Sequence, residues 1–145
     1  MQACRESIAD KVREIYSVNP FMKLCGIEIE ELSCGRAVLA LTIDGQKHFN
    51  LNKSAHGGVI ASLADTSLGV VGATVGKRVV TASLQAAYLR GAGEGSRIRA
   101  CARVVSHDGK FMVVCVEIKN VEKPVAEVLA TMAIIDDFPE IPPEW

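Results

Sequence analysis

The chain has 145 residues, of which 49% are hydrophobic and 23% charged, and its formal net charge at pH 7 is -1. This composition is typical of a globular protein, and the length suits one domain, so we expect a single domain over residues 1–145. The near-neutral charge argues against binding to nucleic acid or to an anionic membrane surface.

The cysteines and histidines argue against a metal site and against a disulfide framework. The five cysteines are widely spaced without a CxxC pair, and the three histidines do not fall at the spacing of zinc ligands. The first sixteen residues are charged throughout and lack the apolar core of a signal peptide. We therefore expect reduced thiols, no bound metal and a cytoplasmic protein.

The first third of the chain predicts one helix followed by two strands. Residues 4–17 carry apolar side chains at the spacing of an amphipathic helix, which ends at Asn19-Pro20. Isoleucine and glutamate alternate across residues 25–32, which predicts a half-buried strand, and residues 36–43 predict a second strand. A polar loop over residues 44–55 then leads to the most informative segment of the sequence.

Residues 57–75 predict a long apolar helix that ends at Gly76, and Asp65 is the one ionisable residue within it. This charge interrupts the apolar run, so the helix is not expected to span a membrane. An ionised carboxylate in an apolar interior is costly unless it is paired, hydrogen-bonded or protonated. Asp65 therefore either faces a gap or a basic partner, or serves as a general base or nucleophile in a largely dry cleft.

Four further strands are predicted at residues 78–90, 96–106, 110–120 and 125–135, separated by the turn sequences GAGEG, HDG and VEKP. The resulting order is a helix, two strands, a long helix and four strands. A helix as apolar as 57–75 has to be covered on nearly every side. The sequence therefore predicts an α+β fold in which a curved antiparallel sheet wraps around one central helix.

The HDG turn also predicts a strand register. A three-residue loop with Gly109 in the left-handed conformation pairs Ser106 with Lys110, and this register places Arg99 opposite Glu117. The residues that alternate with these are expected to share the buried face of the hairpin: Ile98, Ala100, Ala102, Val104, Val114, Val116 and Ile118.

The long helix begins with two glycines after His56. Backbone N–H groups at a helix start carry the positive end of the helix dipole, so the N–H of Gly57 is a candidate oxyanion donor. Close packing of the helix on the sheet would explain the glycines equally well.

Eight residues separate Gly57 from Asp65, or ~12 Å along an α-helix. One carbonyl cannot lie within ~3 Å of both groups in the same copy. If both groups act on one substrate, the active site lies at a dimer interface, with two helices side by side about a two-fold axis.

The chain resembles the hotdog-fold acyl-CoA thioesterases of the phenylacetate-degradation (PaaI-like) family. The resemblance rests on the motif N-x5-HGG-x6-D, on TASLQAAYLRGA and on the final strand VAEVLATMAII, and it covers nearly the whole chain. It implies the hotdog fold, a sheet wrapped around one long helix. It also implies hydrolysis of an aryl- or medium-chain acyl-coenzyme A to the free acid and coenzyme A.

The resemblance assigns roles to the residues of the motif. It makes Asp65 the nucleophile or the base that activates water, and the N–H of Gly57 the oxyanion donor, with Asn50 nearby. It implies that a hydroxyl on the strand after the helix orients the water, for which Ser83 fits. The remaining motif residues, His56 and Gly58, would line the substrate pocket.

One position departs from the family pattern. Lys53 stands where the family often has glycine, so the loop can bend differently and Asn52 competes with Asn50 for the asparagine role. Arg90 and Lys110, at strand ends beside turns, are candidates for binding the coenzyme A phosphates. The resemblance implies no cofactor besides the coenzyme A of the substrate, a homodimer as the smallest active unit, and a homotetramer.

Two other functions fit parts of the sequence. A hotdog dehydratase or hydratase would pair a histidine with a helix carboxylate, but His56 and Asp65 are too far apart in one copy. A non-catalytic acyl-CoA sensor would use the same pocket without hydrolysis. Release of free thiol from acyl-CoA separates the thioesterase from both.

Overall fold

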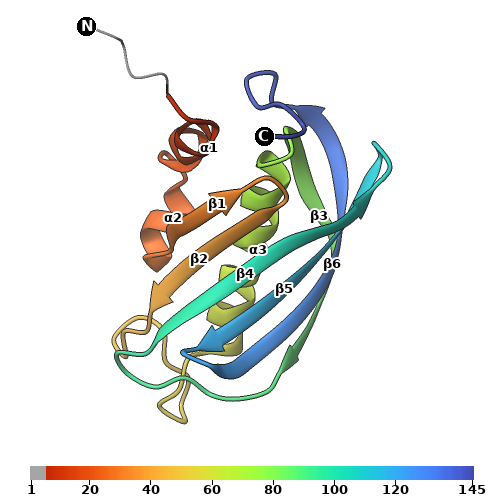
Figure 1. Cartoon of the computed structure of the whole chain (residues 1–145). Coiled ribbons are helices and arrows are strands. Elements are labelled where there is room, and N and C mark those ends of the chain that lie inside the picture. The colour runs from red at the N-terminus through yellow and green to blue at the C-terminus, as the bar shows by residue number, and fades with distance from the viewer. Residues whose placement is uncertain (1–5) are drawn as a thin grey trace, which may run out of the picture.

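The structure, a computed structural model that describes residues 6–145, has an antiparallel sheet wrapped around one long helix (Figure 1). The sheet has six strands in the order β1-β2-β4-β5-β6-β3. The elements are α1 (Ile8–Tyr16), α2 (Pro20–Cys25), β1 (Glu28–Ser33), β2 (Arg36–Thr42), α3 (Gly57–Ala73), β3 (Lys77–Tyr88), β4 (Arg97–His107), β5 (Phe111–Asn120) and β6 (Lys123–Asp137). The predicted α+β architecture is therefore confirmed.

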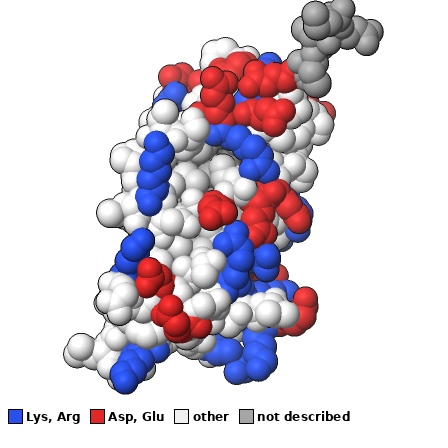
Figure 2. Space-filling view, turned by 90° about the vertical axis from the view of Figure 1, so that its left-hand side faces the viewer, with Lys and Arg blue, Asp and Glu red and all other residues white. Residues whose placement is uncertain are grey.

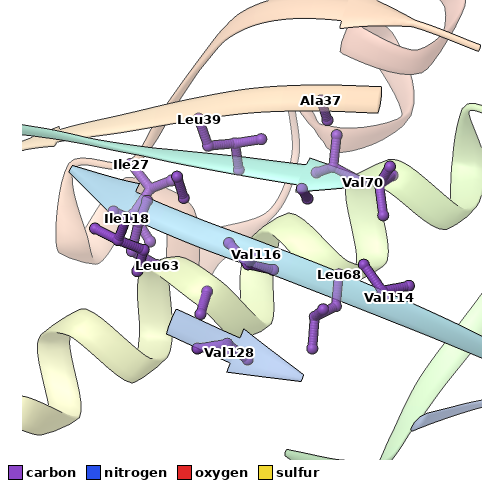
Figure 3. Close-up of a cluster of buried hydrophobic side chains, with 14 of the residues drawn as sticks. Ile27, Ala37, Leu39, Leu63, Leu68, Val70, Val114, Val116, Ile118 and Val128 are labelled. Carbon is purple, nitrogen blue, oxygen red and sulfur yellow. The ribbon is translucent and has the colours of Figure 1, made fainter. Parts of the chain in front are cut away.

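The core of the protein lies between α3 and the concave face of the sheet. Leu63 and Leu68 of α3 are fully buried, and they pack among residues of β2, β4, β5 and β6 (Figure 3). Fully burying a side chain of this size stabilises the fold by about 1.5–3 kcal/mol. Within the part of the chain that the structure describes, no helix has both the length and the apolar character needed to cross a membrane.

The N-terminal helix starts later than the sequence predicts. Ser7 caps α1, because its side chain accepts from the N–H of Asp10 while the Asp10 carboxylate accepts from the N–H of Ser7. The helix therefore begins at Ile8 rather than at residue 4. Residues 4 and 5 of the predicted range lie outside the described residues.

A second short helix, α2, was not predicted. Asn19 caps it by accepting from the N–H groups of Phe21 and Met22, and Pro20 occupies its first position. The Asn-Pro pair that ends α1 therefore also starts a new helix.

The predicted register of the β4–β5 hairpin is wrong by two residues. Arg99 lies opposite Lys119 instead of Glu117, because the loop closes differently. The Asp108 side chain accepts from the N–H groups of Lys110 and Phe111, and a bulge lies between Val104 and Ser106. A shift of two residues keeps every side chain on its face, so the predicted buried face is confirmed.

Strand β3 forms one edge of the sheet, and this edge has no neighbouring strand within residues 6–145. It is 12 residues long, and the stretch from Val79 to Tyr88 carries no charge and no proline. Its pairing with β6 is interrupted between Thr81 and Ser83, where Ala82 forms a bulge. This bulge decides which hydroxyl of β3 faces the helix.

Candidate active site

A tight loop leads into α3 and is organised by Asn50. The loop is closed where Phe49 pairs with Ala55, and the Asn50 carboxamide oxygen accepts from the N–H groups of Asn52 (2.9 Å) and Ser54 (3.1 Å). The Asn50 NH₂ has no acceptor within residues 6–145, so it is free to donate to a ligand. The Asn52 side chain is exposed and forms no hydrogen bond with the described part of the chain.

Lys53, the departure from the family pattern, lies in this loop with φ at +56°. That left-handed conformation is the one glycine adopts most easily. The loop thus makes its turn here with a lysine.

The start of α3 presents one free backbone donor. His56 is the N-cap, and its Nδ1 accepts from the N–H of Gly58 at 2.9 Å. The N–H of Gly57 donates to no acceptor in residues 6–145. A Cβ added at Gly57 would lie 3.4 Å from the ring of Tyr88, so this aromatic ring stands beside the helix start.

Asp65 lies in the middle of α3 with its side chain exposed in the single chain. The expectation of a largely dry cleft is therefore not met by one chain alone. The carboxylate accepts a hydrogen bond of 2.6 Å from the hydroxyl of Thr81 on β3. The neighbouring helix residues Leu63 and Ala64 are fully buried, so Asp65 marks the face of α3 that the sheet does not cover.

The hydroxyl beside Asp65 belongs to Thr81 and not to Ser83. Before the bulge at Ala82, Thr81 pairs with the buried Met132; after it, Ser83 pairs with Thr131 on the outer face of the sheet. The sequence could have indicated Thr81 only if the bulge had been recognised. The structure thus brings together Asp65 and Thr81 in one place, and Asn50, His56, Gly57 and Gly58 in another.

Comparison with known proteins decides the family. The model of the Thioesterase superfamily matches residues 52–127, slightly more than half of the chain, and the match includes every site residue named above except Asn50. The chain belongs to the thioesterase superfamily.

Relatives and solved structures agree with this assignment and with the hotdog fold. The E. coli acyl-coenzyme A thioesterase PaaI is 32% identical over 66% of this chain and 67% of its own length. The solved structure of E. coli PaaI matches with a TM-score of 0.85 at 27% identity, and the match covers 90% of this chain and 94% of that chain. The "Putative esterase" of Archaeoglobus fulgidus is 26% identical over 94% of this chain and 90% of its own. A Streptococcus pneumoniae thioesterase solved with coenzyme A matches with a TM-score of 0.73 at 25% identity, over 77% and 90%. This protein is a PaaI-like hotdog thioesterase, a thioester hydrolase.

The two basic candidates of this thioesterase lie at opposite ends of α3. The loop after β3 contacts the segment before α3, since the N–H of Ala55 donates to the carbonyl of Ala92, and this loop carries Arg90 near the Gly57 end. Lys110 lies in the β4–β5 hairpin, and its carbonyl accepts from the N–H of Ile134. Ile134 pairs with Val79, which faces Gly72 near the end of α3. Figure 1 shows that this hairpin projects at the end of the sheet where α3 ends. Within one chain, therefore, only Arg90 lies at the end that holds Gly57.

Within residues 6–145, no three His, Cys, Asp or Glu side chains lie close enough to hold a metal ion, and the four cysteines there are free thiols. Cys4 lies outside the described residues. On the face that Figure 2 shows, acidic side chains gather near the top, and basic and acidic side chains are interspersed with uncharged surface below them.

Proposed function

We propose that the protein hydrolyses the thioester of an aryl- or medium-chain acyl-coenzyme A at a site shared by two copies of the chain. The E. coli relative is named an acyl-coenzyme A thioesterase, and the pneumococcal structure holds coenzyme A. These relatives support coenzyme A as the carrier of the acyl group. The finer assignment depends on the geometry of α3.

The observation that carries the proposal is the spacing of two complementary groups on one helix. The N–H of Gly57 is an unused donor at the positive end of α3. Eight residues further along the helix, the Asp65 carboxylate accepts a hydrogen bond from Thr81. Each group is half of a hydrolytic site, and ~12 Å of helix separates them. One thioester can therefore use both only if a second copy supplies one of them.

The free edge of β3 supports such a dimer. Antiparallel pairing of two β3 edges, centred between Leu84 and Gln85, places Thr81 opposite the partner's Tyr88. Because Tyr88 packs beside Gly57 within each chain and Thr81 bonds Asp65, this pairing moves the partner's Gly57 toward Asp65 in the middle of α3. The same pairing covers the exposed face of Asp65, which would supply the dry cleft that one chain lacks.

In the proposed reaction, the thioester carbonyl oxygen accepts from the partner's Gly57 N–H, and the NH₂ of the partner's Asn50 adds a second donor. Asp65 either attacks the carbonyl carbon, forming an anhydride that water then hydrolyses, or takes a proton from the attacking water. In both routes the carbon–sulfur bond breaks, the acid is formed, and the coenzyme A thiolate leaves and takes up a proton. Thr81 holds the carboxylate in position, while the partner's His56 and the partner's Gly58 line the pocket and the partner's Arg90 contacts the phosphates.

Release of free thiol from a panel of acyl-coenzyme A thioesters tests the reaction. We expect Asp65→Asn to lower kcat by about 10³-fold, because the carboxylate is lost, while the exposed position leaves the melting temperature unchanged. Wild-type turnover in Asp65→Asn would contradict the role of Asp65. Tight binding of acyl-coenzyme A without thiol release would favour a non-catalytic sensor.

A mixing experiment tests the shared site. Asp65→Asn and Gly57→Pro homodimers each lack one half of every site, whereas a mixed dimer has one complete site and one that lacks both halves. After denaturation and refolding together, we expect about a quarter of wild-type activity to return. A site within one chain predicts no recovery.

The assembly itself is open to a direct measurement. We propose a homodimer as the smallest active unit and a homotetramer as the final assembly, and light scattering coupled to size exclusion gives the mass. An active species with the mass of one chain would exclude the shared site.

A further inference from the structure

A cavity of about 440 Å³ lies between the turn joining α1 to α2 and the start of β3. Three of its wall residues are large apolar side chains left exposed in the single chain: Val18 (75%), Ile135 (57%) and Val80 (46%). Phe138 lies buried at its back. An exposed apolar concavity of this kind is typical of a ligand pocket.

The cavity lies next to Asp65 along the same face of α3. A Cβ added at Gly69 would lie 3.1 Å from the Tyr16 hydroxyl, and Gly69 is one helical turn, ~6 Å, beyond Asp65. On the strand side, Val79 lines the cavity, and Thr81, two residues later, bonds Asp65. A thioester held at Asp65 therefore has the cavity within reach of its acyl group.

Two unused hydrogen-bond donors border this apolar space. The Tyr16 hydroxyl forms no hydrogen bond within residues 6–145, and burial raises the pKa of Tyr16 to about 12, although Arg78 nearby lowers it, so the phenol stays a neutral donor. Arg78 stacks over the Phe138 ring at 4.5 Å and forms no ion pair within the described part of the chain. Its neighbour Lys77, in contrast, is paired with Asp137 at 2.7 Å.

We infer that this cavity receives the far end of the acyl group, and that Tyr16 and Arg78 select acyl groups bearing a polar acceptor there. This inference concerns the substrate class, and it rests on the proposed thioesterase reaction. An apolar tail would displace water from both donors without offering them an acceptor, whereas a distal carboxylate or hydroxyl satisfies them. A carboxylate matches the guanidinium of Arg78, and a ring hydroxyl matches the phenol of Tyr16.

The test compares kcat/KM for two matched substrate pairs. Hexanoyl- and adipoyl-coenzyme A differ by a terminal carboxylate, and phenylacetyl- and 4-hydroxyphenylacetyl-coenzyme A differ by a ring hydroxyl. We expect the polar-tipped member of at least one pair to be preferred by about 10-fold or more in the wild type. The pair that shows the preference identifies the acceptor.

Two conservative variants then assign the preference to a residue. Arg78→Met is expected to lower kcat/KM for the carboxylate substrate about 10-fold and that for hexanoyl-coenzyme A less than about 3-fold. Tyr16→Phe is expected to remove the hydroxyl preference in the same way. Lys77→Met is the matched control, because it removes the adjacent positive charge outside the cavity and should leave both ratios unchanged.

The outcomes separate this inference from the proposed function. If the wild type hydrolyses all four thioesters with equal kcat/KM, or if both variants keep the wild-type ratios, the selection by Tyr16 and Arg78 is wrong and the thioesterase reaction stands. If the wild type releases no thiol from any of the four, the proposed acyl-coenzyme A reaction itself fails. If a variant lowers kcat/KM equally for both members of a substrate pair, the substituted residue has only a structural role and the selection is wrong for that residue.

Discussion

The two ends of α3 differ in whether their free backbone groups find hydrogen-bond partners. Every helix ends in backbone groups without helical partners. At the C-terminal end, the Thr74 hydroxyl accepts from the N–H of Gly35 and donates to the carbonyl of Val71, and the Trp145 indole donates to the carbonyl of Thr74. At the N-terminal end, the N–H of Gly57 is left unused.

The C-terminal end of α3 therefore contributes to the stability of the fold, whereas the N-terminal end is open to a ligand. The closed end uses side chains that are distant in sequence, which ties the helix to the β1–β2 turn and to the C-terminal segment. The open end has a donor, a small residue and a loop with a free carboxamide. Within residues 6–145 the N-terminal end of α3 keeps a backbone donor without a partner, whereas the C-terminal end is capped. The N–H of Gly57 is therefore available to a substrate.

The largest effect is expected from removing the free donor at the open end. Gly57→Pro deletes the N–H but suits the first position of a helix, and His56, with φ -60° and ψ 138°, has the conformation that precedes proline. We expect kcat to fall by about 10²–10³-fold with an unchanged melting temperature. Gly57→Ala, which keeps the N–H, should lose far less; equal losses in the two variants would point to crowding by the side chain.

A smaller loss is expected at Thr81, which connects Asp65, the other half of the site, to strand β3. Thr81→Val removes the hydrogen bond to Asp65 while keeping the shape, and should lower kcat by roughly 10- to 100-fold. Thr81→Ser should restore most of the activity. Ser83→Ala is the matched control on the same strand; a larger loss there than at Thr81 would return the role to Ser83.

At the closed end, substitution should affect stability and not catalysis. Thr74 is fully buried, and Thr74→Val leaves the N–H of Gly35 without its acceptor. We expect the free energy of unfolding to fall by about 1.5 kcal/mol in a denaturant titration. A drop in kcat at full folding would show that the two ends are coupled.

The smallest effect concerns an ion-pair cluster on the outer face of the sheet. The hydrogen bond from Arg99, reinforced by Arg97, holds the pKa of Glu30 below its ordinary value. A depressed pKa stabilises the fold above the unfolded-state pKa, and this contribution disappears as the pH falls through the folded-state value. Glu30→Gln should therefore lower the free energy of unfolding by about 0.5 kcal/mol at pH 7 and by progressively less as the pH falls through the folded-state pKa of Glu30, as urea titrations at pH 7 and over a series of acidic pH values would show.

The sequence predicts the parts of this molecule that depend on local pattern. The limits of α3 follow from HGG and from Gly76, and the alternation of apolar residues assigns the buried face of the β4–β5 hairpin correctly. The isolated charge at Asp65 and the eight-residue spacing to Gly57 are also visible without a structure. These features depend on residues close together in the chain.

The features that the sequence did not predict depend on how strands meet. The bulge at Ala82 exchanges the two faces of β3, so Thr81 reaches Asp65 and Ser83 does not. The bulge after Val104 and the turn at Asp108 shift the hairpin register by two residues. The cavity beside Tyr16 joins α1 to the start of β3, more than 60 residues later, and no local pattern signals it.

The free edge of β3 also has a consequence for how the protein survives in solution. Proteins usually guard such edges with lysine, proline or a short strand, because an open edge invites aggregation with other chains. Here ten consecutive residues, from Val79 to Tyr88, carry neither charge nor proline. A chain without a partner would therefore be at risk of precipitating, so the proposed pairing of two β3 edges would also protect the protein against misassembly.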